Sequence, residues 1–195
     1  MSNPIEGLRD STIFNLTKAI TMVVDDSDFG LVLTTEALRG FGIQTRYTCH
    51  SAGAAMEILK ESTIDLLVVD CEMPGMDGHE LVRWLRGARI DPNSYVPVIM
   101  TAGHVRKSKV KAVRDCGANF LVTQPFSAGS LLERLIWVAR DNRPFLETSE
   151  YKGPDRRLSS PEPRDENERR SDMIVRLAMR AREANLAAES SPVSA

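Results

Sequence analysis

Five short apolar runs alternate with helix-like patterns between residues 18 and 142 of this chain. The third run, Leu66 to Val69, is wholly apolar, which is typical of a central parallel strand buried on both faces. Five strand-then-helix units predict a parallel sheet covered by helices on both faces, with right-handed crossovers. The sequence therefore predicts a doubly wound α/β fold with a five-stranded parallel sheet. The expected strands are 19–24, 43–48, 66–69, 96–100 and 120–122, and the expected helices are 29–39, 51–60, 78–86, 105–116 and 128–140.

Apolar periodicity suggests which side of the first two helices faces the sheet. Helical neighbours on one face are three or four residues apart. The stripe expected inward in the first helix is Phe29, Val32, Leu33 and Glu36–Ala37, and in the second it is Ala54, Ala55, Ile58 and Leu59.

Charge and cysteine content argue against several classes of protein. The formal net charge of −2 gives no reason to expect a nucleic acid or a membrane as the main partner. The three cysteines, Cys49, Cys71 and Cys116, lack metal-like spacing and are expected to be reduced thiols. No run approaches the ~18 apolar residues of a membrane helix, and the N-terminus lacks a signal-peptide pattern. We therefore expect a cytoplasmic protein.

The sequence changes character after residue 142. Charged residues become frequent, and Pro154, Pro161 and Pro163 interrupt any early helix. Ile174 and Leu177 then begin an apolar stripe at helical spacing. We expect a lead-in over 1–17, one domain over 18–142, and over 143–195 a charged, partly disordered linker with an amphipathic helix at about 166–188.

Polar side chains stand where the predicted strands end. Asp25 and Asp26 follow the first strand, Asp70 the third and Thr101 the fourth. Ligands of doubly wound sheets bind at this edge. Three close carboxylates repel one another unless a cation is present, and oxygen-only ligands suit Mg²⁺. A carboxylate can also accept a phosphoryl group, to which Thr101 could donate a hydrogen bond.

Four segments together resemble a known family. They are Val24-Asp25-Asp26-Ser27, Val69-Asp70-Cys71-Glu72-Met73-Pro74-Gly75-Met76-Asp77-Gly78, Ile99-Met100-Thr101-Ala102 and Gln124-Pro125-Phe126. In order and spacing they resemble the receiver domains of bacterial response regulators in two-component systems, which have the flavodoxin-like fold of CheY. The resemblance covers about residues 18 to 142.

The resemblance implies a role for each matching residue. Asp70 corresponds to the phosphoacceptor, and Asp25 and Asp26 to the acidic pair that binds Mg²⁺. The backbone carbonyl of Glu72 would complete the metal site together with Asp70, and Thr101 would be the switch hydroxyl. A sensor histidine kinase or a histidine phosphotransfer protein would donate the phosphoryl group. The output would be contact with a downstream protein, made by the last helices or the tail.

The chain departs from the family pattern at Gln124, where receivers have a lysine. Glutamine keeps a hydrogen-bond donor but supplies no charge, and charge-assisted hydrogen bonds are roughly twice as strong as neutral ones. A second departure is Leu121, where many relatives have an aromatic residue. Coupling between phosphorylation and conformational change is therefore in question.

Three functions follow from these features. The first is a phosphorylatable signalling receiver, with no enzyme activity expected of it. The second, motivated by Gln124, is a phosphorylation-independent adaptor that uses the receiver fold only as a binding surface. The third is a phosphatase with an aspartate nucleophile, for which Glu72 would be the acid/base group, although the usual aspartate is absent there.

One segment of the tail resembles a short motif that follows some bacterial receivers. It is Tyr151-Lys152-Gly153-Pro154-Asp155-Arg156-Arg157. The interpretation favoured by composition alone is a solvated, charged linker.

Overall fold

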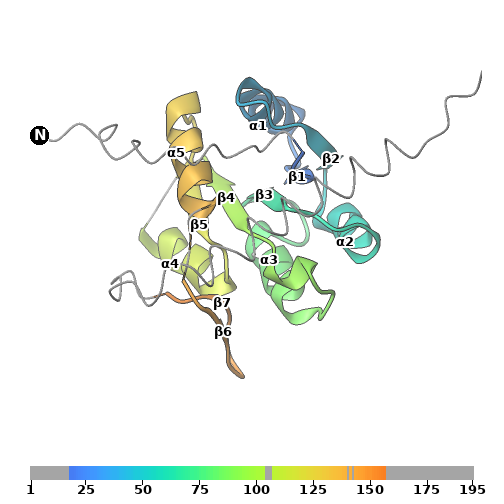
Figure 1. Cartoon of the computed structure of the whole chain (residues 1–195), viewed down its shortest axis with the longest axis vertical. Coiled ribbons are helices and arrows are strands. Elements are labelled where there is room, and N and C mark those ends of the chain that lie inside the picture. Colours follow the sequence, from blue (N-terminus) through green and yellow to red (C-terminus); the bar gives the residue numbers. More distant parts are fainter. Residues whose placement is uncertain (1–17, 104–106, 140, 142, 157–195) are drawn as a thin grey trace, which may run out of the picture.

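The predicted sheet is present. The computed structural model describes residues 18–103, 107–139, 141 and 143–156. Five parallel strands pair in the order β2-β1-β3-β4-β5 (Figure 1), which confirms the doubly wound, flavodoxin-like fold. Their bounds are β1 Thr21–Val24, β2 Thr45–Cys49, β3 Leu66–Asp70, β4 Val98–Ala102 and β5 Phe120–Thr123.

The predicted helices also form, and several of them begin with a side-chain cap. Ser27 and Ser51 accept hydrogen bonds from backbone N–H groups of α1 and α2, and Asp77 forms a capping box with Glu80 at α3. Within the described residues, no helix is long and apolar enough to cross a membrane. The helices are α1 Asp28–Gly40, α2 Ala52–Glu61, α3 Gly78–Gly87, α4 Lys107–Cys116 and α5 Ala128–Ala139, with a 3₁₀ turn, η2, at Asn93–Tyr95.

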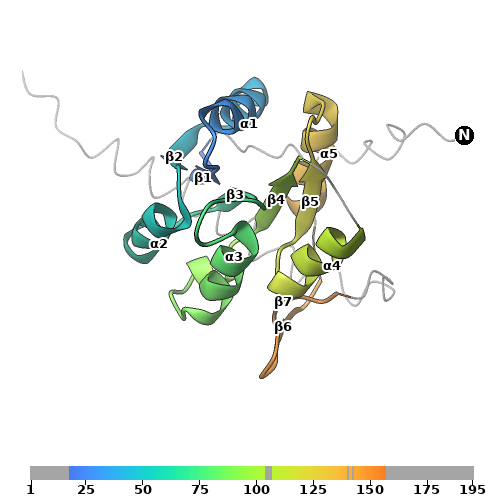
Figure 2. The same ribbon diagram turned by 180° about the vertical axis from the view of Figure 1, so that it is seen from behind.

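Alternate strand residues face two separate layers of helices. Helices α1 and α5 lie on one face of the sheet, and α2, α3 and α4 lie on the other (Figures 1 and 2). Met22, Leu67 and Met100 pack toward the three-helix layer, whereas Val23 and Ile99 pack toward α1 and α5. Both faces of the central strands are therefore buried, which explains their apolar composition.

Helix α1 presents a different side to the sheet from the one that periodicity predicts. Phe29 and Val32 are 75% and 59% exposed, whereas Gly30, Leu31 and Leu38 are buried. The helix begins so close to the end of β1 that a β-carbon on residue 30 would overlap the Asp25 carboxylate. Only glycine fits there, and this contact rotates the larger apolar side chains outward. In α2, Ala55 and Leu59 are buried as expected, but Ala54 is exposed.

The prediction of a charged linker from residue 143 onward is wrong for residues 143–156. These residues form an antiparallel hairpin of β6 Phe145–Glu147 and β7 Lys152–Pro154. Tyr151 is 7% exposed, and its hydroxyl donates a hydrogen bond to the Pro154 carbonyl at 2.6 Å. The segment is ordered because its aromatic residues and glycine pack on the domain, which overrides its polar composition. The lead-in over 1–17 and the amphipathic helix expected at 166–188 lie outside the described residues.

Arg86 of α3 joins the hairpin to the edge of the sheet opposite the acidic residues. This side chain is buried, and its guanidinium donates to the carbonyls of Gly117, Ser94 and Val96 at 3.0, 2.9 and 2.8 Å. The ring of Phe145 covers it, with the centroid 5.3 Å from the guanidinium carbon. Burial lowers the pKa of Arg86 to about 10, so the group remains cationic at neutral pH.

Two glycines allow the hairpin to approach the turn between α4 and β5. Gly117 has a φ of 93°, a conformation that side chains disfavour. A β-carbon on Gly117 would overlap the backbone carbonyl of Lys152, and one on Gly153 would lie 2.6 Å from the α-carbon of Gly117. The two backbones are therefore in direct contact.

Replacing Gly117 should destabilise the domain. We expect Gly117→Ala to lower the free energy of unfolding by about 1–3 kcal/mol, because it adds backbone strain and displaces the hairpin. Gly53→Ala is the matched control, since Gly53 lies within α2 with open space around it, and it should gain about 0.5–1 kcal/mol. Urea denaturation measures both, and equal stability of the two variants would contradict the packing described here.

Candidate functional site

The acidic residues come together at the carboxyl edge of the sheet. Strands β1 and β3 are neighbours with Val24 paired to Val69, so Asp25 and Asp70 follow at adjacent positions. Asp70 is paired in turn with Thr101 of β4. Strand alternation places the side chains of Asp25, Asp70 and Thr101 on the α1 face. The structure therefore brings together the residues that sequence reasoning selected.

Asp70 is half-buried and held by two donors. The Thr101 hydroxyl donates to one carboxylate oxygen at 3.3 Å, and the backbone N–H of Glu72 donates to the other at 2.8 Å. Burial raises the pKa of Asp70, these hydrogen bonds oppose the rise, and the negative charge of Asp26 adds to it. Among the described residues, none of the main influences on this pKa is a cation.

Asp25 is buried, 4% exposed, beneath the first turn of α1. Its carboxylate accepts a hydrogen bond from the backbone N–H of Ser27 at 2.9 Å. Burial raises its pKa, and the charges of Asp70 and Asp26 raise it further. Gly30 is a site residue that sequence reasoning missed, because a β-carbon there would occupy the position of this carboxylate. The only sequence signal for this role is the presence of a glycine within the first turn of the helix.

Asp26 is exposed and borders an open depression that is lined by residues following Asp70 in sequence. His79 also lines this depression. A histidine at the start of a helix is ordinarily expected in solvent, but this side chain is only 8% exposed. Its Nδ1 lies 3.7 Å from an Asp77 carboxylate oxygen. The acceptor side of the site is therefore accessible from solvent. The lining residues are Asp26, Cys71, Glu72, Met73, Pro74, Asp77 and His79.

Gln124 lies at the same edge of the sheet, directly after β5. Its backbone N–H donates to the Ala102 carbonyl at 2.7 Å. Its side-chain nitrogen is buried and has no hydrogen-bond partner among the described residues. A buried donor without a partner costs free energy. An acceptor such as a phosphoryl oxygen would remove that cost if it lay within reach.

The donor set suits a hard divalent cation in part. Asp25, Asp26 and Asp70 influence one another electrostatically, so a nearby dication would relieve their repulsion. Within the described part of the chain, no three His, Cys, Asp or Glu side chains form a complete ligand cluster. Mg²⁺ needs only one or two carboxylates and keeps several waters. The arrangement therefore fits Mg²⁺ better than a metal held by a protein cage.

Removing the Asp70 charge should stabilise the fold. Because the folded-state pKa lies above 3.8, the native protein binds this proton more tightly than the unfolded chain. The contribution of Asp70 to the free energy of unfolding is therefore fully present below pH 3.8 and is lost as pH rises through the folded-state pKa. We expect Asp70→Asn to be more stable than the wild type at neutral pH, with the difference closing in acid.

Denaturant titrations across the acid range test this expectation. Asp28→Asn is the control, because the Asp28 side chain is 96% exposed, and it should change stability little. A less stable Asp70→Asn at neutral pH would show that the hydrogen bonds to this carboxylate outweigh its burial.

Comparisons with known proteins agree with the fold and the motifs. The chemotaxis protein CheY of Pseudomonas aeruginosa is 29% identical over 115 residues, which are 58% of this chain and 90% of that protein. The solved signal receiver domain of a histidine kinase from Syntrophus aciditrophicus is 26% identical with a TM-score of 0.55, covering 67% of this chain and 97% of that one.

A third likeness supports the fold alone. The receiver domain of the histidine kinase CKI1 from Arabidopsis thaliana, solved in complex with Mg²⁺, is 22% identical with a TM-score of 0.54 and covers 60% of this chain and 91% of that one. The family described as the response regulator receiver domain matches residues 21–136, more than half of the chain. The chain therefore belongs to the response regulator receiver domain family of two-component signalling.

Proposed function

We propose that this receiver accepts a phosphoryl group on Asp70 and signals through protein–protein contacts. The observation that carries the proposal is the position of Asp70 at the end of β3, half-buried and held by Thr101 and the Glu72 N–H. The donor would be a sensor histidine kinase or a histidine phosphotransfer protein, which implies a cytoplasmic location.

Each residue of the site has a task in this reaction. A carboxylate oxygen of Asp70 attacks the phosphorus, so that an O–P bond forms as the N–P bond to the donor histidine breaks. The Thr101 hydroxyl donates to a phosphoryl oxygen, and the unpartnered amide of Gln124 is a further candidate donor. Both donors are neutral, so they orient the group but offset little of its charge.

Mg²⁺ is the cofactor that fits this proposal. Asp25, Asp26, Asp70 and the backbone carbonyl of Glu72 would hold it, as the family resemblance implies. When bound, it would supply positive charge beside Asp70, where none of the described residues is a main cationic influence. The likeness to a Mg²⁺-bound receiver supports this assignment through the shared fold.

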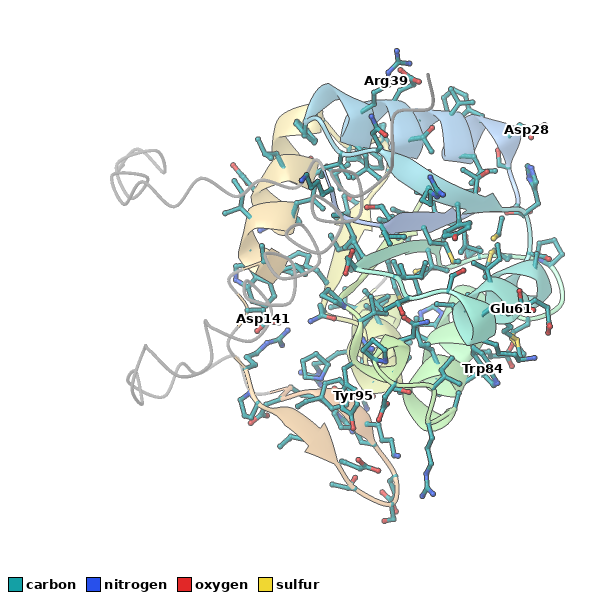
Figure 3. The ribbon with its side chains drawn as sticks, turned by 45° about the vertical axis from the view of Figure 1, so that its right-hand side comes forward. Asp28, Arg39, Glu61, Trp84, Tyr95 and Asp141 are labelled. Atoms are coloured by element: carbon teal, nitrogen blue, oxygen red, sulfur yellow. The ribbon has the colours of Figure 1, made fainter. Side chains whose placement is uncertain are left out.

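The exposed apolar side chains of α1 offer a contact for the phosphoryl donor. Phe29 and Val32 lie on the helix that begins three residues after Asp25. Figure 3 shows Asp28 at the end of this helix, far from the C-terminal hairpin. A donor protein resting on this helix would therefore lie close to Asp70. The downstream partner is a further protein, which this surface does not identify.

A second candidate function is a phosphorylation-independent adaptor. Gln124 favours it, because a neutral amide stands where receivers have a lysine and charge-assisted hydrogen bonds are stronger than neutral ones, so the phosphoryl group would be coupled weakly to the fold. A phosphatase has less support, since Glu72 is exposed and the group that it donates to Asp70 is its backbone N–H. The two leading functions differ in whether Asp70 is modified.

Intact mass after incubation with Mg²⁺ and acetyl phosphate tests the proposal. We expect one phosphoryl adduct on the wild type, none on Asp70→Asn, and none when a chelator removes the metal. Asp28→Asn should form the adduct normally, because its carboxylate is exposed and is not among the groups that hold or influence Asp70. No adduct on the wild type, together with no binding of beryllium trifluoride, would leave the adaptor function.

Gly30 should control the metal affinity of the site. We expect Gly30→Ala to weaken Mg²⁺ binding by about 10–100-fold, the usual cost of disturbing a group that orients a ligand, because the added methyl displaces the Asp25 carboxylate. Isothermal calorimetry measures the affinity. Gly40→Ala on the same helix is the control, since Gly40 has open space around it. Equal affinities in the two variants would show that Asp25 does not bind the metal.

A further inference from the structure

The hairpin of residues 143–156, which we call the clasp, contacts elements that are distant in sequence. Its strands lie beside the lower ends of α3 and α4 (Figures 1 and 2), and the labelled Tyr95 and Asp141 border it in Figure 3. Phe145 packs edge-on against Tyr95, with the ring centroids 4.8 Å apart. The same ring also covers the buried guanidinium of Arg86. These contacts fix the first strand of the clasp.

A second set of contacts ties the clasp to the end of α5. Arg143 donates to the Asp141 carboxylate at 2.7 Å and to the Asn119 carbonyl at 3.3 Å. Its guanidinium also lies over the Trp137 ring, 4.8 Å from the centroid. The Arg143 side chain is 19% exposed and that of Asp141 is 5% exposed, so this attachment is largely shielded from water.

Helix α4 is packed lightly by comparison. Among its side chains that the structure describes, only Val113 and Cys116 are buried, both near its C-terminal end. Val110 is 49% exposed, and Lys111 and Arg114 face solvent. A helix with few buried apolar contacts opens locally at low free-energy cost. Its attachment to the rest of the domain therefore depends strongly on contacts at its C-terminal end.

The clasp supplies such a contact through a half-exposed ion pair. The guanidinium of Arg156 donates to the Asp115 carboxylate at 2.8 Å and stacks on the Tyr151 ring, 3.7 Å from its centroid. The side chains of Arg156 and Asp115 are 37% and 34% exposed. Unlike the buried contacts of the clasp, this pair can be opened without disturbing the core.

The other end of α4 is close in sequence to the acceptor site. The helix begins at Lys107, six residues after Thr101, whose hydroxyl donates to Asp70. Helix α4 therefore follows the strand that carries Thr101 in sequence and contacts the clasp at its last turn. A ligand whose binding is coupled to the position of α4 would act on the clasp and, by thermodynamic linkage, the reverse would also hold.

We propose that the clasp is a conformational device, in which the Asp115–Arg156 ion pair holds α4 in place and links the acceptor site to the chain that continues beyond Arg156. The link between the two sites rests on the proposed function, whereas the hold on α4 does not. The motif from Tyr151 to Arg156 gains a role in this way: it closes the receiver fold and fixes the point at which the C-terminal tail leaves it.

Hydrogen exchange of the full-length chain tests the hold on α4. Arg156→Gln should speed exchange of the amides from Val113 to Cys116 by about two- to fivefold, the range expected for a half-exposed ion pair, and leave α2 unchanged. The double variant with Asp115→Asn should exchange no faster than Arg156→Gln alone. Lys152→Gln is the matched control, because it removes an ion pair with Glu147 inside the clasp. Unchanged exchange in α4 would overturn the proposal.

A second comparison adds Mg²⁺ and beryllium trifluoride, with binding measured separately by calorimetry. The mimic should slow exchange of the clasp amides of Thr148 and Asp155 in the wild type, and Arg156→Gln should lose this effect. Binding without any change in the clasp would overturn the link but leave the proposed function intact. Failure of the mimic to bind would count against the proposed function and the link together, while the first comparison would still decide whether the clasp holds α4.

Discussion

A single buried cation organises the lower edge of this domain. Among the described residues Arg86 donates no hydrogen bond to a carboxylate, and it is satisfied by backbone carbonyls from η2, from Val96 two residues before β4 and from the turn after α4. A buried charge that loses its partners is strongly destabilising. The positions of α3, the start of β4 and the turn at Gly117 are therefore mutually dependent, and Phe145 seals the arrangement against water.

The opposite edge of the sheet has the reverse electrostatic character. Asp25 and Asp70 have raised pKa values because burial and like charges disfavour their ionised forms, and the main influences on Asp70 include no cation. This edge lowers the stability of the fold at neutral pH, whereas the Arg86 contacts and the two-sided apolar core support it. Such a division is typical of functional sites, where residues are selected for chemistry at a cost in stability.

Much of the fold could be predicted because it depends on local patterns. The apolar run before Asp70 and the caps at Ser27, Ser51 and Asp77 define strands and helices without tertiary information. The convergence of Asp25, Asp70 and Thr101 also followed from a general rule about strand ends. The exposed face of α1 could not be predicted from such a rule, because it depends on the close approach of Gly30 to the Asp25 carboxylate. The clasp was not predicted because the segment is rich in charged residues. Its order depends on the burial of Tyr151 and on the contact of Gly153 with Gly117, which composition does not reveal.

The contact between Gly117 and Gly153 has a consequence for how this receiver can be recombined with other proteins. Each backbone occupies the space in which the other residue would need a side chain. A chimera that joins a foreign output module directly after α5 would uncover Gly117 and the aromatic cover of Arg86. A clasp grafted onto a receiver with a larger residue at the position of Gly117 would not pack against the turn between α4 and β5. The natural junction for domain exchange is therefore after residue 156, well beyond the last helix of the sheet domain.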